Sequence, residues 1–296
     1  MSVIERPHSP AMDALLGKEI PVLDHGFIRL IDYMGNDDAI VQAARVSYGR
    51  GTKAVSDDRA LIRYLMRNRH TTPFEMAEIK LHVRLPIFVA RQWIRHRTAS
   101  VNEYSARYSV LDREFYVPKV DAVGGQSASN RQGRSIDFDP AEAQLIADTF
   151  RSDAERAYDR YLELLNQDRE GNTLSAERTG VARELARINL PLSFYTQWYW
   201  KINLHNLLGF LSLRAHPHAQ LEIRAYAEEI LKIVAVWVPH TYEAFIDYRQ
   251  DSFELSRGAL QAVRQMLRGE KVIPSDVGLS QREWSELMER LDARHS

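Results

Sequence analysis

The chain has 296 residues, of which 45% are apolar and 27% are charged, and its formal net charge is -1. This composition is typical of a soluble globular protein, and its near-neutral charge excludes the broad positive field that gathers nucleic acid or anionic lipid. Cysteine is absent, which excludes disulfides, thiolate metal sites and a thiol nucleophile.

Before residue 86 the sequence predicts one helix and one strand. The helix begins near Ser56, where a capping serine and two aspartates suit the positive end of a helix dipole, and it ends before "HTTPFE". The segment "EIKLHVRL" at 78–85 alternates between apolar and polar residues, which predicts a half-buried strand. Pro86 lacks the N–H that a first helical turn leaves unused, so we expect a helix over 86–96.

The later elements are mostly helices. Polar residues at 98–105 predict a loop, and residues 119–138, rich in Gly, Ser, Asn and Gln, predict a mobile excursion. Further predicted elements are a short strand at 114–118, a long helix opened by Asp139 and Pro140, a helix at about 176–188, a strand at 193–202, a helix capped by Asn203, a helix at about 219–236, and two charged helices beyond residue 250, the second opened by the capping box of Ser280 and Glu283. Because strands and helices mix without regular βαβ alternation, the predicted fold class is α+β.

The segment richest in chemical groups is "RQWIRHRTASVNEYSARY" at 91–108. If it begins as a helix, Arg91 and Arg95 lie on one face among apolar residues that leave little solvated surface. Arginine near an interior needs an anion, and Glu103 is the only acid between residues 79 and 111. A ligand phosphate or carboxylate is therefore the expected partner, and the hydroxyl and amide groups that follow suit a base or sugar.

The residues alone leave three interpretations of this segment open. They are nucleotide binding, an ordinary solvated surface and contact with RNA. No glycine-rich phosphate loop accompanies the segment, so side chains would hold any phosphate. His216 and His218 flank a proline without acidic or thiolate neighbours, so no metal site is expected.

The motif Arg95-His96-Arg97, followed by seven residues and Ser105, resembles the RHR-x7-S signature of the flavin-dependent thymidylate synthases. Three other segments agree with that family in order: "HTTPFE" at 70–75, "ARINLPLSFYTQWYWKINLHN" at 186–206 and "LRAHPHAQLEIRAYA" at 213–227. The similarity spans about residues 20–245. It implies a single α+β domain with a mixed or antiparallel sheet flanked by helices, in which 119–138 is a flexible insertion, followed by a helical C-terminal extension at 250–296.

The resemblance implies an enzyme that methylates dUMP to dTMP. It implies FAD as cofactor, NADPH as reductant and 5,10-methylenetetrahydrofolate as one-carbon donor, in a homotetramer whose sites are shared between subunits. No protein nucleophile is needed in this family, which agrees with the missing cysteine. No nucleic-acid or membrane partner is expected, and without a signal peptide or an apolar span a cytoplasmic location is expected. Two alternatives remain: a non-catalytic nucleotide- or RNA-binding module, and a flavin-dependent RNA uracil methyltransferase.

The same resemblance assigns roles to residues by their position in the motifs. Those implied to bind FAD are Thr72, Arg95, His96, Arg97, Glu103, Asn203 and His205. Those implied to bind dUMP are Gln92, Arg95, Glu103, Tyr104, Ser105, Ala106, Arg107, Arg187 and Arg214. His70 and Glu75 are implied to line the site. Arg214 is the expected electrostatic catalyst, because a guanidinium beside the pyrimidine favours loss of the N3 proton. His205 stands where some relatives have arginine, and Gly209 where some have a polar FAD ligand.

Overall fold

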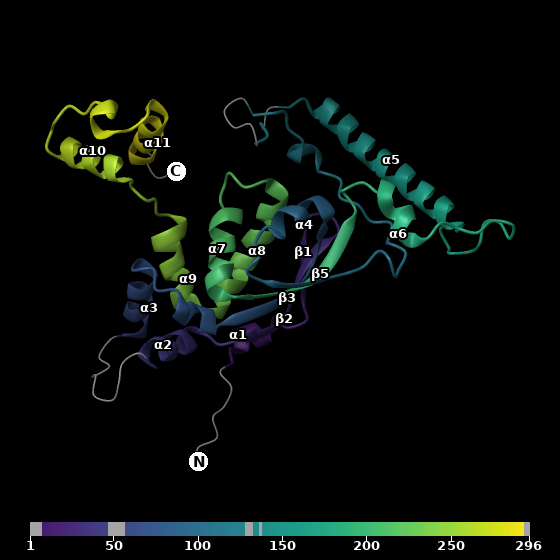
Figure 1. Cartoon of the computed structure of the whole chain (residues 1–296), viewed down its shortest axis with the longest axis horizontal. Helices are drawn as coiled ribbons and strands as arrows, with labels where there is room; N and C mark the ends of the chain where they lie inside the picture. Colours follow the sequence, from purple (N-terminus) through teal and green to yellow (C-terminus); the bar gives the residue numbers. More distant parts are fainter. Residues whose placement is uncertain (1–7, 47–56, 128–132, 136–137, 293–296) are drawn as a thin grey trace, which may run out of the picture. The chain divides into compact units, whose positions relative to one another are not determined.

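The computed structural model describes residues 8–46, 57–127, 133–135 and 138–292 (Figure 1). The chain divides into two compact units, Met1–Gln250 and Asp251–Ser296. Residues 128–132 and 136–137 of the predicted excursion lie outside the described residues.

The larger unit is built on a five-stranded antiparallel sheet with the strand order β1-β2-β3-β5-β4. The strands are β1 (Glu19–Val22), β2 (Gly26–Met34), β3 (Glu78–Pro86), β4 (Ser100–Glu103) and β5 (Tyr195–Asn203). The alternation predicted for β3 is confirmed, because Ile79, Leu81 and Val83 are buried while the residues between them are partly exposed. The predicted α+β class with an antiparallel sheet is therefore confirmed.

Helices surround this sheet in the larger unit. They are α1 (Pro10–Asp13), α2 (Asp37–Val46), α3 (Asp58–Arg67), α4 (Ile87–Trp93), α5 (Pro140–Leu165), α6 (Arg183–Ala186), α7 (Leu204–Arg214), α8 (Leu221–Trp237) and α9 (Pro239–Phe245), with the 3-10 turns η1 (Thr72–Met76), η2 (Val120–Ala122) and η3 (Arg187–Asn189) and the π-helical turn η4 (Ile246–Gln250). Two predicted helix starts are confirmed. The Asp139 side chain accepts from the Glu142 N–H at 2.8 Å, and the Asn203 side chain accepts from the Asn206 N–H at 2.9 Å.

An aromatic cluster joins α4, β5 and α7 inside the core. The fully buried Trp93 ring packs edge-on against Trp198 and Trp200, at centroid distances of 5.8 and 5.1 Å. It also contacts the tilted ring of Phe210 at a centroid distance of 4.8 Å. Because buried aromatic pairs contribute packing energy beyond their area alone, this cluster holds the end of α4 in place. The RHR motif follows directly from that anchored helix end.

The helix predicted over 86–96 is too long. It ends at Trp93, and Ile94 is its C-cap, so Arg95 lies beyond the helix and not one turn above Arg91. The loop predicted over 98–105 is also wrong, because it contains the edge strand β4. All four residues of β4 are exposed, so the strand lacks the apolar alternation by which strands are recognised.

Other predicted boundaries need correction. The helix expected at 176–188 is reduced to α6 and the short turn η3, and residues 114–118 form only one bridge, between Phe115 and Phe194, instead of a strand. Asp57 is the N-cap of α3, and Ser56 lies outside the described residues. The elements α1, α2, β1 and β2 precede the first predicted helix and were not predicted.

The smaller unit contains α10 (Arg257–Leu267), η5 (Pro274–Val277) and α11 (Gln281–Asp292) around a small apolar cluster. The predicted capping box is confirmed, since Ser280 N–H donates to Glu283 Oε2 at 2.8 Å and Glu283 N–H donates to Ser280 Oγ at 3.2 Å. None of the described helices is long and apolar enough to cross a membrane.

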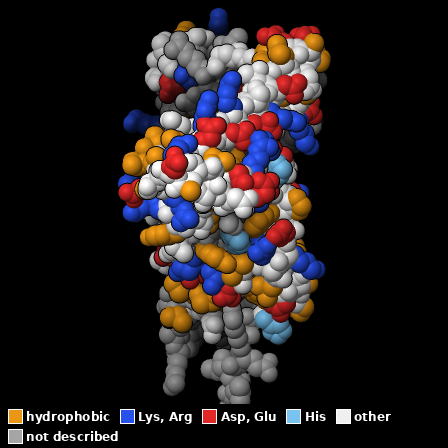
Figure 2. Space-filling view, turned by 90° about the vertical axis from the view of Figure 1, so that its right-hand side faces the viewer, with side chains coloured by type: hydrophobic (Ala, Val, Ile, Leu, Met, Phe, Trp, Pro, Cys, Tyr) orange, Lys and Arg blue, Asp and Glu red, His pale blue; other side chains and the backbone are white. Residues whose placement is uncertain are grey.

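The surface shown in Figure 2 mixes charges of both signs. Lys and Arg side chains are interspersed there with Asp and Glu side chains and with scattered apolar groups. This face therefore presents no broad basic surface of the kind that extended nucleic-acid binding requires.

Candidate functional site

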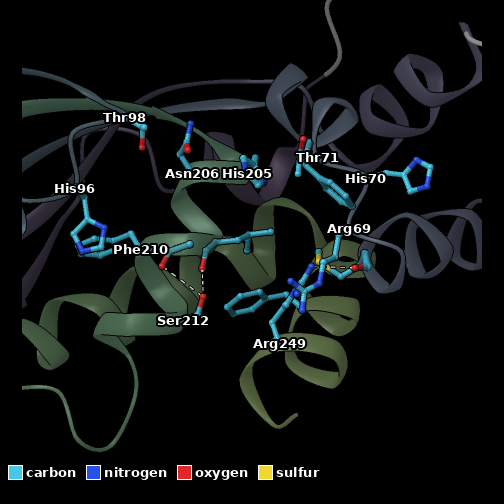
Figure 3. A pocket seen from close by; sticks show the side chains of 15 residues that line it. Arg69, His70, Thr71, His96, Thr98, His205, Asn206, Phe210, Ser212 and Arg249 are labelled. Atoms are coloured by element: carbon cyan, nitrogen blue, oxygen red, sulfur yellow. Dashed lines mark hydrogen bonds between the residues drawn. The ribbon is translucent and has the colours of Figure 1, made fainter. Parts of the chain in front are cut away.

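A cavity of about 420 Å³ lies in the larger unit among the end of α3, η1, the segment after α4, α7 and η4 (Figure 3). We call it the central pocket. Its polar lining is rich in hydrogen-bond donors and contains no carboxylate: Arg69, His70, Thr71, His96, Thr98, His205, Asn206, Ser212 and Arg249. The first turn of α7 contributes His205 and Asn206, so the positive end of this helix dipole is at the pocket. Such a lining suits a ligand that bears phosphate groups.

His96 and Arg214 are joined by a hydrogen bond at one side of this pocket. Arg214 Nε donates to His96 Nε2 at 3.1 Å, and the His96 ring packs edge-on against Phe210 at 4.9 Å. Burial and then the Arg214 charge lower the pKa of His96 below its usual value. His96 is therefore a neutral acceptor at pH 7, and it fixes the orientation of the guanidinium at the end of α7.

Arg95 lies close enough to Arg214 for the two positive charges to repel. Burial and then Arg95 lower the pKa of Arg214. Within the described ranges, neither arginine has a carboxylate at ion-pair distance. Two neighbouring guanidinium groups without an internal counter-ion favour an anionic ligand.

The segment after the RHR motif is fixed at the edge of the sheet. Glu103 Oε1 accepts from the hydroxyl of buried Thr196 at 2.7 Å, and Ser105 Oγ accepts from the Arg107 N–H at 3.3 Å. Arg107 forms an exposed ion pair with Glu184 of α6 at 3.0 Å. These contacts orient the Glu103 and Ser105 side chains before any ligand binds.

Gln92 begins a chain of hydrogen bonds that ends at a buried carboxylate. Its amide donates to Gln220 Oε1, and Gln220 Nε2 donates to Glu222 Oε2 at 2.8 Å. Glu222 also accepts from Arg134 at 2.7 and 2.9 Å and from the Tyr116 hydroxyl at 3.1 Å. Burial alone would raise the pKa of Glu222, but Arg134 and Gln220 outweigh it and lower the pKa. This chain fixes which way the Gln92 amide faces.

The central pocket brings together only part of the predicted site. His70, His96 and His205 line it, together with Gly209, where an added Cβ would contact nothing. Thr72 does not line it, whereas the preceding hydroxyl residue Thr71 does. The other residues implied by the motifs do not line this cavity either: Gln92, Arg95, Arg97, Glu103, Tyr104, Ser105, Ala106, Arg107, Arg187, Asn203, Arg214 and Glu75. Their roles stay predictions.

Four residues of this region were not predicted from the sequence. Arg69 and Arg249 line the central pocket, and Gln220 and Glu222 hold Gln92. Glu222 had a usable signal, since it precedes Tyr226 and Ile230 at four-residue spacing on the buried stripe of α8, where a carboxylate needs a partner. Among the residues that the structure describes, no group of three or more metal-ligating side chains could hold a metal ion.

The chain is similar to known proteins over most of its length. Residues 29–240 match the family model described as thymidylate synthase complementing protein. A flavin-dependent thymidylate synthase of Gluconobacter oxydans is 61% identical over 287 residues, covering 97% of this chain and 92% of that protein. One of Rickettsia bellii is 58% identical over 279 residues, covering 94% and 95%.

A solved structure is also similar to this chain. The structure of a UMP/dUMP methylase, PolB from Streptomyces cacaoi, bound with 5-Br UMP, matches with a TM-score of 0.67 and 35% identity, covering 78% of this chain and 98% of that chain. The family match spans most of the chain, and the relatives cover nearly all of it at high identity. The chain therefore belongs to the flavin-dependent thymidylate synthase family.

Proposed function

We propose that this protein catalyses the reductive methylation of dUMP to dTMP, with FAD as cofactor, NADPH as reductant and 5,10-methylenetetrahydrofolate as one-carbon donor. The observation on which this rests is the arrangement of Arg95, His96 and Arg214. Two guanidinium groups lie together without a carboxylate partner in the described part of the chain, beside a neutral histidine. An anionic pyrimidine nucleotide supplies the missing negative charge.

The residues present fit a flavin dinucleotide. The central pocket combines two arginines, three histidines and several hydroxyl groups with apolar walls such as Phe74 and Phe210, and no carboxylate lines it. We assign His96, His205 and the neighbouring hydroxyls of Thr71 and Thr98 to the cofactor. When bound, reduced FAD supplies the hydride that completes the methyl group.

Arg214 is the proposed electrostatic catalyst. His96 holds its Nε, and its terminal nitrogens make no hydrogen bond within the described ranges, so they are available to a ligand. Beside the pyrimidine, this fixed positive charge favours loss of the N3 proton and stabilises the negative charge that develops on the ring. Because His96 is neutral, it does not compete for that negative charge.

The remaining polar groups bind and orient dUMP. Gln92 is oriented through Gln220, and Glu103 through Thr196, so each is held in one geometry without ligand. Such prior orientation lowers the entropy cost of reaching the reactive geometry. Ser105 and Arg107 are assigned to the phosphate, for which Arg107 exchanges its exposed partner Glu184.

We also propose a homotetramer with shared sites. The exposed edge strand β4 leaves one side of its backbone available to another chain, and the assigned residues are divided between the central pocket and the α6–η3 region. A molecular mass measured by light scattering tests this assembly. A monomer at micromolar concentration that is fully active would contradict it.

The decisive assay is the release of tritium from C5-labelled dUMP. We expect release only when FAD, NADPH and methylenetetrahydrofolate are all present, and dTMP should accumulate in equal amount. A protein that binds no flavin, or that methylates uracil in RNA and leaves dUMP unchanged, would refute the proposed function. Labelled RNA should therefore be tested in parallel.

A further inference from the structure

The described part of the 119–138 excursion forms a loop with its own backbone pairing. Arg134 lies in an antiparallel bridge within this loop, and the Ser135 N–H donates to the Gly125 carbonyl at 2.8 Å. At Gly124 an added Cβ would lie 2.0 Å from the Ser135 carbonyl oxygen, so this close approach of the two backbones requires glycine. The backbone therefore holds Arg134 in a defined place.

The Arg134 side chain reaches from this loop to a buried carboxylate. Its Nη1 donates to the Ala122 carbonyl at 2.5 Å, and its Nη2 donates to both Glu222 oxygens at 2.7 and 2.9 Å. The Glu222 side chain is 3% exposed, whereas that of Arg134 is 33% exposed. A carboxylate buried this deeply is stable in its charged form only when it is paired and hydrogen-bonded. The loop therefore supplies the positive charge that keeps Glu222 ionised.

An ionised Glu222 determines the direction of the hydrogen bonds that follow it. A carboxylate has no proton to donate, so the Gln220 amide turns its Nε2 toward Glu222, at 2.8 Å from Oε2. The Oε1 of Gln220 then faces Gln92 and accepts from its Nε2. Gln92 consequently keeps its Oε1 and one N–H for another partner, and in the described ranges no protein group is hydrogen-bonded to that Oε1.

Tyr116 holds the same carboxylate from another side. Its hydroxyl donates to Glu222 Oε1 at 3.1 Å. Burial and then the charge of Glu222 raise the pKa of Tyr116, so this hydroxyl stays protonated and continues to donate. Arg134, Tyr116 and Gln220 therefore surround the carboxylate. Loss of Arg134 removes the positive charge of this set, which two neutral donors cannot replace.

We propose that Arg134 is a positioning residue for dUMP, which acts through Glu222 and Gln220 on the orientation of Gln92. The inference rests on the proposed function, because Gln92 is assigned there to dUMP, and it gives the excursion a role that the family motifs do not. Without the guanidinium, Glu222 loses its charge or moves toward water, and the Gln220 amide is free to turn. Gln92 then meets the nucleotide with the wrong group in a fraction of the molecules.

Two variants change Arg134, and one matched control changes another arginine. Arg134→Ala removes the guanidinium, and Arg134→Lys retains a charge that cannot reach the Ala122 carbonyl and both carboxylate oxygens together. The control is Arg113→Ala, because the Arg113 side chain is 36% exposed but its partner Glu155, at 3.2 Å, is 41% exposed. An exposed pair of this kind contributes little to stability. Thermal unfolding verifies that all three proteins are folded.

Tritium release at saturating FAD, NADPH and folate measures kcat and the KM for dUMP, and flavin fluorescence measures the Kd for FAD. We expect Arg134→Ala to raise the KM for dUMP by about three- to tenfold, as for the loss of one neutral hydrogen bond. Both kcat and the Kd for FAD should stay within about twofold of the wild type, because the loss affects binding of dUMP and not the chemical step. Arg134→Lys should be intermediate, and the control should match the wild type. If Arg134→Ala does not fold, the intermediate KM of Arg134→Lys provides the same test.

A double-mutant cycle with Gln92→Ala separates positioning from a general loss of structure. In a protein without the Gln92 amide, Arg134→Ala has nothing left to orient, so its effect on the KM for dUMP should disappear. An equal rise in KM with and without Gln92 would show that Arg134 acts by another route, and the proposal would be refuted.

The remaining outcomes are distinct. If the wild type converts dUMP and Arg134→Ala leaves the KM for dUMP unchanged, the positioning role is refuted and the proposed function stands. A fall in kcat without a change in KM has the same meaning. If the wild type neither binds nor methylates dUMP, the proposed function fails and the positioning role fails with it.

Discussion

Asp37 caps a helix that belongs to a distant part of the chain. Its Oδ1 accepts from the Thr241 N–H at 3.0 Å and from the Thr241 hydroxyl at 2.6 Å, and its Oδ2 accepts from the His240 N–H at 2.8 Å. Helix α9 has no capping side chain at its own N-cap, Val238. Asp37 is buried and supplies that cap from the start of α2. Because α9 continues into η4, the cap also supports Arg249.

We expect Asp37→Ala to destabilise the larger unit by about 3–5 kcal/mol. Each hydrogen bond to a charged acceptor contributes about 1.5–3 kcal/mol when removed singly, but the three bonds share one carboxylate and are not additive. At roughly 2–4 °C per kcal/mol for a unit of this size, the melting temperature should fall by about 10 °C.

The assay is thermal unfolding followed by circular dichroism, with Asp38→Ala as the control. Asp38 is the exposed neighbour on the same helical turn, and its loss should cost less than about 1 kcal/mol. Asp37→Asn should fall between the two, because its amide retains an acceptor for Thr241 but presents an NH2 group to His240. Equal melting temperatures for the Asp37 and Asp38 variants would refute the capping argument.

Three further predictions concern the site. Arg214→Ala should lower turnover by about 10²–10³-fold with flavin still bound, whereas Arg97→Ala should be purified without flavin. Absorbance spectra measure the bound flavin, and the tritium assay measures turnover. Equal activity of the two variants would contradict these assignments. The pKa of His96 is lowered in the folded state, so its contribution to stability is present above about pH 6.5 and is lost as the pH falls through the folded pKa. The free energy of unfolding in urea should therefore decline less steeply below about pH 6.5 for His96→Gln than for the wild type. Identical declines would exclude this linkage. Glu222→Leu leaves Arg134 without its carboxylate and should lower the free energy of unfolding by about 2–4 kcal/mol, a range already reduced because Arg134 is partly exposed. The same variant should raise the KM for dUMP, because Gln92 is no longer oriented through Gln220. An unchanged KM would show that the chain of hydrogen bonds does not orient Gln92.

Local patterns in the sequence predicted several elements correctly. The alternation in β3 and the caps at Asp139, Asn203 and Ser280 depend on side chains within a few positions of the backbone groups that they satisfy. The RHR motif is equally local, and it identified the family that the comparisons later showed. The exposed edge strand β4 was missed because its residues do not alternate.

The sequence by itself determined the family, the α+β class and a local cluster of arginines at 91–107, all four of which are exposed in the structure and not partly buried as predicted. Only the tertiary structure decided which cations share a cavity and how each is held. Arg214 meets His96, Gln92 reaches Glu222 through Gln220, and Arg249 approaches Arg69 only after the sheet and helices have packed. The physical reason is that burial and charge repulsion depend on contacts between segments far apart in the chain, and local spacing contains no information about those contacts.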